Sequence, residues 1–155
     1  MKLYFVRHTT AADNAPSDAQ RPLTRQGEEE ARLVGAALAS LSVLPERIFS
    51  SPLLRARQTA ASIGRELKFA GTIEAIEELN NGESTPALLR ALPAASEIIL
   101  VGHMPSLAEH LAAMIGSPTA AGFAFGKGSV ACIEFQDSSG NLQWFKHLSQ
   151  FASAY

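Results

Sequence analysis

Arg7 and His8 stand side by side directly after the apolar residues 3–6, and a second histidine, His103, follows the mainly apolar residues 97–102. Arginine can bind two oxygens of a phosphoryl group at once. A neutral imidazole is a nucleophile toward phosphorus when an acceptor holds its other ring nitrogen. These residue types indicate phosphoryl chemistry. Taken alone, an Arg-His pair at the end of a strand is also an ordinary basic surface feature, so the interpretation depends on the rest of the chain.

Arg55 and Glu78 are predicted to lie at the same edge of the fold. Arg55 falls in the first turn of a helix predicted to begin with Ser51 as its cap and Pro52 in the first helical position. Glu78 follows a strand predicted at residues 72–76. Ligands of open α/β sheets bind beyond the carboxyl ends of the strands. Because positioning and charge stabilisation catalyse most of phosphoryl transfer, two arginines, one nucleophilic histidine and a second, protonated histidine would suffice without a metal.

Apolar runs without polar alternation predict the strands that must position these residues, because such strands are buried on both faces. Stretches with helical spacing separate them, and Thr24 is predicted to cap the first helix. Residues 129–135 and 142–147 are predicted as two edge strands joined by a turn at 137–141. The sequence therefore predicts an α/β fold with a mostly parallel sheet and an antiparallel edge. The other predicted strands cover residues 2–6, 47–50, 72–76 and 97–102, and the predicted helices cover 24–41, 51–67 and 85–92, with a fourth after residue 103.

The composition limits the class of protein. With 155 residues, 46% of them hydrophobic and 18% charged, the chain is expected to form a single domain over residues 1–155. A formal net charge of −2 gives no electrostatic case for nucleic acid or an anionic membrane as partner. No apolar run approaches the roughly 20 residues of a membrane span, and no signal peptide is expected. Because Cys132 is the only cysteine, no internal disulfide can form, and a cytoplasmic location is expected.

Four motifs together resemble the histidine phosphatase superfamily, whose members share the phosphoglycerate mutase-like fold. The motifs are Leu-Tyr-Phe-Val-Arg-His-Thr at 3–9, Pro-Leu-Thr-Arg-Gln-Gly at 22–27, Ser-Ser-Pro-Leu-Leu-Arg-Ala-Arg-Gln-Thr-Ala at 50–60 and Val-Gly-His at 101–103. They occur in the order of the family. The short chain and the segment 21–24 look most like the small bacterial phosphohistidine phosphatases. The resemblance implies a three-layer α/β/α sandwich.

The resemblance also implies roles for individual residues. His8 matches the nucleophile that becomes phosphohistidine, and Arg7, Arg55 and His103 match the phosphate pocket. Arg21 matches an arginine that the small phosphatases place beside this pocket.

Two further matches leave alternatives open. Asn14 falls where mutase-like members keep a phosphate-binding asparagine, and it is equally well interpreted as an amide that caps its own loop. Glu78 matches the carboxylate that protonates the leaving oxygen and later activates water. Glu77 and Glu83 are its neighbours, and the small phosphatases are poor in this acid.

Thr9 departs from the family, which usually has glycine after the first histidine. Glycine permits a positive φ or a close approach of the backbone. A threonine here is expected to narrow the pocket or to alter the turn, or to donate its hydroxyl to the phosphate. His110 and His147 are interpreted as lying outside the site.

The leading interpretation is a phosphatase without cofactor or metal that works through a phosphohistidine on His8. Its expected partner is a phosphorylated protein, above all protein phosphohistidine, or a small phosphorylated metabolite. A mutase is the alternative enzyme, but the chain has no long insertion between the third and fourth strands to cover the site and exclude water. A non-catalytic phosphate-binding module is the remaining alternative, and Thr9 is the only feature that favours it. The oligomeric state is left open.

Overall fold

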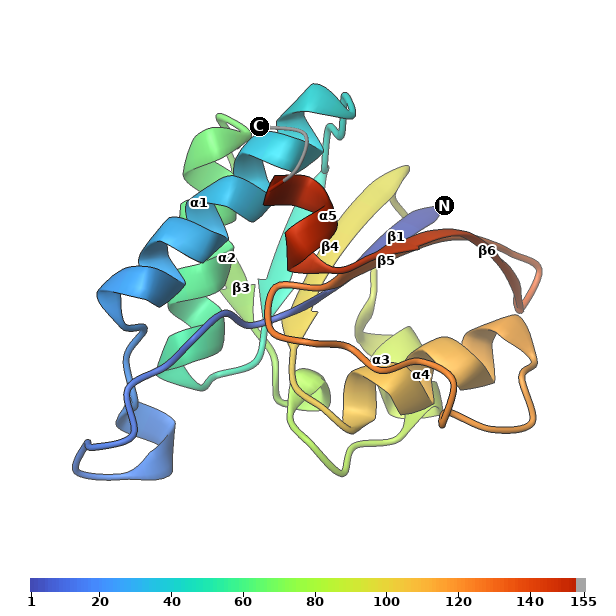
Figure 1. The fold of residues 1–155 in the computed structure, drawn as a ribbon. Helices are drawn as coiled ribbons and strands as arrows, with labels where there is room; N and C mark the ends of the chain where they lie inside the picture. Colours follow the sequence, from blue (N-terminus) through green and yellow to red (C-terminus); the bar gives the residue numbers. More distant parts are fainter. Residues whose placement is uncertain (153–155) are drawn as a thin grey trace.

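The computed structural model describes residues 1–152, in which strands and helices alternate along most of the chain (Figure 1). The strands are β1 (Lys2–Arg7), β2 (Arg47–Ser50), β3 (Glu74–Ala75), β4 (Glu97–Gly102), β5 (Val130–Gln136) and β6 (Ser139–Lys146). The helices are α1 (Arg25–Ser40), α2 (Leu54–Glu66), α3 (Thr85–Ala91), α4 (Ser106–Ile115) and α5 (Leu148–Ala152), with the short 3-10 helices η1 (Asp18–Gln20) and η2 (Glu77–Leu79). None of the helices found between residues 1 and 152 is long and apolar enough to cross a membrane.

The strands form one sheet in the order β3-β2-β4-β1-β5-β6. β1 pairs with β4 in parallel, and β4 with β2 and β2 with β3 are also parallel. β5 runs antiparallel to β1, and β6 runs antiparallel to β5. The predicted α/β fold with a mostly parallel sheet and an antiparallel edge is therefore confirmed.

The register of β1 on β4 brings the ends of the two strands level. Arg7 pairs with Gly102. The backbone N–H of His8 then donates to the carbonyl oxygen of Gly102 at 3.1 Å. His103 directly follows Gly102, the last residue of the neighbouring strand β4. The two histidines therefore follow the ends of adjacent strands.

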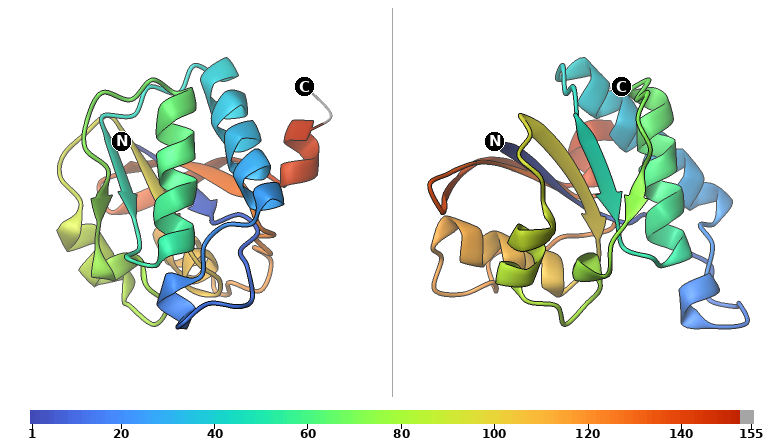
Figure 2. Two further views of the ribbon diagram at one scale, coloured as in Figure 1. Left: turned by 90° about the vertical axis from the view of Figure 1, so that its left-hand side faces the viewer. Right: turned by 180° about the vertical axis from the view of Figure 1, so that it is seen from behind.

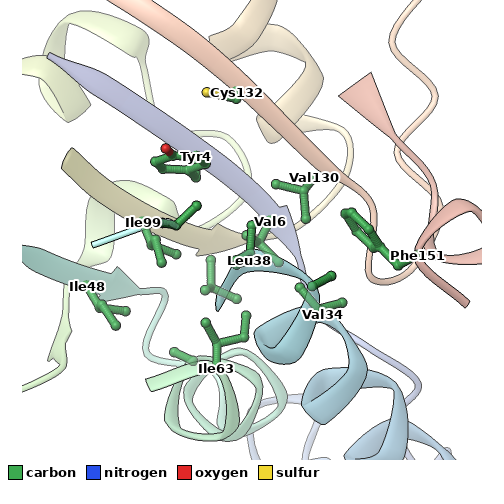
Figure 3. Packing of buried hydrophobic residues seen from close by; sticks show 14 of the residues in the cluster. Tyr4, Val6, Val34, Leu38, Ile48, Ile63, Ile99, Val130, Cys132 and Phe151 are labelled. Carbon is green, nitrogen blue, oxygen red and sulfur yellow. The ribbon is translucent and has the colours of Figure 1, made fainter. Parts of the chain in front are cut away.

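Helices cover both faces of the sheet, which makes the predicted three-layer sandwich (Figure 2). Alternate residues of β1 point to opposite faces. Tyr4 and Val6 pack with the apolar sides of α1, α2 and α5, as Figure 3 shows for this core. Leu3 and Phe5 pack with α3 and α4 on the other face. Because both faces are buried, the apolar pattern of β1 carries no alternation.

The ends of several elements differ from the sequence predictions. Thr24 caps α1 as predicted, and its hydroxyl accepts from the backbone N–H of Gly27 at 3.0 Å. The prediction that Ser51 caps the next helix is wrong, because α2 begins at Leu54 with Leu53 as its N-cap, and the Ser51 hydroxyl bonds to Leu53 N–H and to His103 and not to an N–H within the helix. The predicted strand at 72–76 is reduced to the two residues of β3. The sequence reading also missed η1, η2 and α5.

Candidate active site

His8 and His103 lie against each other at the carboxyl ends of β1 and β4. Their ring centroids are 5.0 Å apart, and the ring planes are inclined by 50°. Both side chains are buried, with 7% of His8 and 3% of His103 exposed. The convergence that the sequence predicted for these histidines is therefore present in the structure.

The ring of His8 is held in one tautomer by the backbone. Its Nδ1 lies 2.8 Å from the carbonyl oxygen of Thr9. A carbonyl can only accept, so Nδ1 carries the proton and Nε2 keeps its lone pair. Burial lowers the pKa of His8 to about 4, and the positive charges of Arg55, Arg7 and Lys127 act in the same direction. At neutral pH, His8 is a neutral imidazole with a free lone pair on Nε2.

His103 is also neutral. Its Nε2 lies 2.5 Å from the hydroxyl oxygen of Ser51. Burial lowers the pKa of His103 to about 3, and His8, Arg55 and Arg7 lower it further. The prediction of a protonated second histidine is therefore wrong for the protein without a bound anion. The Nδ1 atom of His103 is buried and has no hydrogen-bond partner among the described residues.

Arg55 enters the site from the first turn of α2. Its side chain is buried, and its Nη1 donates to the carbonyl oxygen of Asp18 at 2.9 Å. Nη2 donates to the Asp18 carboxylate at 3.3 Å. The hydroxyl of Thr59, one turn further along α2, donates to the Arg55 carbonyl at 2.8 Å. The loop at Asp18 thus holds the side chain of Arg55, and Thr59 bonds to its backbone carbonyl within α2.

Arg7 adds a second guanidinium from the end of β1. Its Nη1 donates to the carbonyl oxygen of Phe125 at 2.8 Å. Its Nε is buried without a partner among residues 1–152, and burial lowers the pKa of Arg7. A buried donor without a partner costs about 1–3 kcal/mol. An anion that accepts from Arg7 would remove this cost. We call Arg7, His8, Arg55 and His103 the basic cluster.

Asp18 links the basic cluster to Arg21. The Asp18 carboxylate accepts from Arg21 Nη1 at 3.2 Å as well as from Arg55. Arg21 is itself held by the carbonyl oxygen of Ala12, to which its Nε donates at 2.7 Å. The hydrogen bonds from Arg21 and Arg55 lower the pKa of Asp18. Arg21 therefore lies next to the cluster, as predicted, but its contact with Arg55 runs through Asp18.

The sequence analysis missed both Asp18 and Lys127 as neighbours of the basic cluster. Asp18 lies in η1, on a loop that projects from the body of the molecule in Figure 1. Lys127 lies in the turn whose Gly128 N–H donates to the Arg7 carbonyl at 3.1 Å. The position of Asp18, three residues before Arg21 in a polar loop, could have indicated an ion pair between them. Nothing in the sequence indicated that Lys127 lies near the cluster.

Thr9 does not face an anion site. Its hydroxyl is buried and donates to the carbonyl oxygen of Gly27 at 2.7 Å. Its N–H donates to the Thr59 hydroxyl at 3.2 Å, and its φ is not positive. The prediction that the Thr9 hydroxyl binds phosphate is therefore wrong, whereas a narrower pocket and an altered turn stay predictions. Thr9 instead ties the segment of His8 to α1 and, through Thr59, to α2 and Arg55.

The glycine of the second motif, Gly27, is required for steric reasons. A Cβ on Gly27 would stand 1.9 Å from the carbonyl oxygen of Thr10. Only glycine lets α1 approach the segment after β1 this closely.

No hydrogen bond or ion pair within residues 1–152 joins Asn14 or Glu78 to the basic cluster. Asn14 is exposed on the loop before η1. Glu78 is half-buried in η2, and its loop is docked on the segment after His103. The Asn81 side chain donates to the Met104 carbonyl oxygen at 2.8 Å, and the Gly82 N–H donates to the Ser106 hydroxyl at 2.9 Å. The structure places Glu78 on the His103 side of the site without bonding it there.

The low pKa values of the two site histidines predict that stability falls between pH 7 and pH 5. Unfolded histidines take up a proton near pH 6.5, whereas folded His8 and His103 have pKa values of about 4 and about 3. In that window the unfolded chain binds more protons, so the free energy of unfolding increases with pH. Urea denaturation at pH 7 and pH 5 measures this change. The His8→Ala variant should lose part of it, and an unchanged pH dependence in that variant would contradict the low pKa of His8.

No group of three or more His, Cys, Asp or Glu side chains among residues 1–152 is arranged to hold a metal ion. The ligand chemistry of the site is that of the basic cluster. Guanidinium groups and imidazole N–H groups suit an oxyanion.

The basic cluster lies where the parallel strands of an α/β sheet end. This arrangement is typical of proteins that act on phosphoryl groups. The family model of the histidine phosphatase superfamily (branch 1) matches residues 3–86. The chain belongs to this superfamily, and it is a phosphatase, a hydrolase that acts on phosphoryl groups.

Individual relatives agree with this assignment. The phosphohistidine phosphatase SixA of Escherichia coli (strain K12) is 30% identical over 150 residues, which are 93% of this chain and 92% of SixA. A structure of the protein histidine phosphatase SixA complexed with tungstate matches with a TM-score of 0.89 and 28% identity, over 97% of this chain and 99% of that one. A phosphoserine phosphatase from Entamoeba histolytica shares the fold, with a TM-score of 0.74 and 16% identity over 95% of this chain and 97% of that one.

Proposed function

We propose that the protein removes the phosphoryl group from a phosphohistidine residue of another protein, through a phosphohistidine intermediate on His8. The state of His8 carries this proposal. Its Nδ1–H is held by the Thr9 carbonyl, and Nε2 keeps its lone pair beside His103 and two guanidinium groups. This is the state of a nucleophile. A module that only binds phosphate would gain more from a protonated histidine, so the non-catalytic alternative is less well supported.

The proposed reaction has two displacements at phosphorus. Nε2 of His8 attacks the phosphoryl group, the bond from phosphorus to the substrate imidazole breaks, and that nitrogen takes a proton from solvent. Water then attacks phosphorus on His8, inorganic phosphate leaves, and Nε2 regains its lone pair. Arg7 and Arg55 bind the phosphoryl oxygens, and their charge stabilises the transition state. Arg21 acts from outside, through Asp18.

Phosphohistidine is favoured as the substrate by two observations. The SixA relative, which aligns over nearly the whole chain, is a phosphohistidine phosphatase. The leaving group of phosphohistidine is a nitrogen that depends little on an acid, which suits a site where Glu78 has no bond to the basic cluster.

A mutase that acts on a small metabolite is less well supported. Only η2 and α3 lie between β3 and β4, so this connection builds no long cover over the cluster. We further propose a single domain without nucleic acid as partner and a cytoplasmic location, which the net charge of −2 and the lone, free Cys132 support. Asn14 stays outside the proposed site.

Trapping the intermediate tests the proposal. Incubation with phosphoramidate, a small donor with a P–N bond, should label the protein with an acid-labile and alkali-stable phosphate, which mass spectrometry locates on His8. Turnover of a phosphohistidine protein, 3-phosphoglycerate and sugar phosphates is then compared. Label on another residue, or no label in a folded protein, would favour the binding module. Faster turnover of a metabolite than of the protein substrate would reassign the substrate.

The Glu78→Gln variant tests whether Glu78 is the general acid. If it is, turnover of alkyl phosphate esters should fall by about 10²-fold or more, because an alkoxide needs a proton to leave. Turnover of phosphohistidine should change by no more than a few-fold. Glu83→Gln is the matched control, since Glu83 is a neighbouring exposed carboxylate. Equal effects of Glu78→Gln on both substrates would reject the role of Glu78 as acid.

A further inference from the structure

Ser51 is a buried side chain at the end of β2 that the catalytic scheme above does not use. Its exposed fraction is 0%. Its hydroxyl oxygen lies 2.5 Å from Nε2 of His103, a residue of the neighbouring strand segment. The same oxygen accepts the backbone N–H of Leu53 at 3.3 Å. The Ser51 hydroxyl therefore bonds both to the backbone of Leu53, just before α2, and to the ring of His103.

The hydrogen bonds of Ser51 fix the direction of its own proton. Leu53 N–H can only donate, so it occupies a lone pair of the Ser51 oxygen. Within residues 1–152, the only other group bonded to that oxygen is Nε2 of His103. If Nε2 carried the proton, the Ser51 hydroxyl hydrogen would be buried with no acceptor, which costs about 1–3 kcal/mol. When Ser51 donates to Nε2, both the hydroxyl and Nε2 are satisfied, and Nδ1 of His103 is the one atom of the pair left without a partner within residues 1–152.

This direction sets the tautomer of His103. A neutral imidazole that accepts at Nε2 carries its proton on Nδ1. The Nδ1 atom of His103 is the atom that is buried without a partner, in a ring 5.0 Å from that of His8. The unpaired N–H therefore belongs to the basic cluster, where a phosphoryl oxygen would be its acceptor.

We propose that Ser51 is a positioning residue, which holds neutral His103 as the Nδ1–H tautomer so that it donates to a phosphoryl oxygen without being protonated. The proposal rests on the proposed function, and it adds the source of the donor. The chain of donors runs from Leu53 N–H to the Ser51 hydroxyl and on to Nε2 of His103. No proton is transferred along it. A donor that is prepared before the substrate binds needs no reorganisation during the reaction.

The tautomer can be measured without any turnover. Nitrogen-15 NMR of the imidazoles separates a protonated ring nitrogen from one with a lone pair. In the wild-type protein at pH 7 we expect His103 to show a protonated Nδ1 and an unprotonated Nε2. In Ser51→Ala, the Nε2–H tautomer that a free histidine side chain prefers should predominate. A wild-type His103 with its proton on Nε2 overturns the proposal, even if the Ser51→Ala variant does not fold.

Kinetics of Ser51→Ala on the phosphohistidine substrate give the second readout. Complete removal of a preorganised donor costs about 10²–10³-fold in kcat. Because the His103 ring stays in place in Ser51→Ala, we expect a smaller loss in kcat, on the order of tenfold, with KM nearly unchanged. Ser50→Ala is the matched control. Ser50 is equally buried, but its hydroxyl donates to the Ser51 carbonyl at 3.0 Å and does not contact His103. The control should keep the wild-type tautomer and kcat.

The two hypotheses fail in different ways. A wild-type protein without phosphatase turnover but with the Nδ1–H tautomer contradicts the proposed function and leaves the role of Ser51 supported. Normal kcat in a folded Ser51→Ala variant, or an unchanged tautomer in that variant, overturns the role of Ser51 whether or not His8 forms the intermediate.

Discussion

The His8→Ala variant is expected to lose phosphatase turnover, with kcat reduced by about 10⁴-fold or more. The variant lacks the lone pair that forms the bond to phosphorus, and no other described side chain is placed to supply it. Nε2 of His103 is occupied by the Ser51 hydroxyl. The fold should survive, because the backbone bonds that hold this segment, from His8 N–H to Gly102 and from Thr9 N–H to Thr59, remain. Turnover of a phosphohistidine protein and phosphoramidate labelling measure the loss.

The matched control for His8→Ala is His147→Ala. His147 is exposed on the segment between β6 and α5, and its ring bonds to the Ser129 hydroxyl at 3.2 Å and packs edge to face against Phe145. This variant should keep full labelling and turnover. Normal turnover in folded His8→Ala would show that phosphoryl transfer proceeds without an intermediate on this residue, and direct attack by water would then be the mechanism to consider.

The position of the two histidines was predictable from the sequence because it depends on a strong signal. Residues 3–6 and 98–101 are apolar without alternation, and only central strands with both faces covered bury such runs. Once two such strands are parallel neighbours, the residues that follow them must leave the sheet together. Because Arg7 pairs with Gly102 in the register of β1 on β4, His8 and His103 follow at the same level.

The contacts of Asp18 could not be predicted in the same way. Asp18 belongs to a polar loop with an exposed carboxylate, and composition shows that such a segment is a loop but does not give its path. Its path depends on Arg21, which bonds to the Ala12 carbonyl. Its contact with Arg55 joins residues 37 positions apart.

Ser51 and Thr9 were misinterpreted because local sequence patterns suggested one role, whereas a partner distant in the sequence determines the actual hydrogen bond. Ser51-Pro52 fits the pattern of a helix start, but the Ser51 hydroxyl hydrogen-bonds to the imidazole of His103, which follows the neighbouring strand β4. Thr9 follows the motif histidine, and proximity alone suggested a phosphate contact. The close approach of Gly27 to Thr10 instead turns the Thr9 hydroxyl toward α1.

The Arg55→Lys variant is expected to lose about 10²-fold or more in kcat/KM, the second largest effect. Lysine keeps the charge and the helix propensity, so α2 should form as before. It lacks the planar fork, however, and cannot at once bind a phosphoryl group and make the two bonds that Arg55 makes to Asp18. The loss should fall on KM as well as kcat, because ground-state binding and charge stabilisation both use this side chain.

Arg57→Lys is the matched control for this substitution, since Arg57 lies two residues further along the same helix and is exposed. The comparison separates a general effect of replacing an arginine of α2 by lysine from the loss of the guanidinium of Arg55. A further variant, Asp18→Asn, keeps the backbone carbonyl that accepts from Arg55 Nη1, and it removes the charge of the carboxylate together with one of the two oxygens that accept from Arg21 and Arg55. Its effect should be smaller than that of Arg55→Lys. If Arg55→Lys and Arg57→Lys instead reduce kcat/KM equally, the loss comes from a general effect of replacing arginine in α2, and direct binding of the phosphoryl oxygens by Arg55 must be abandoned.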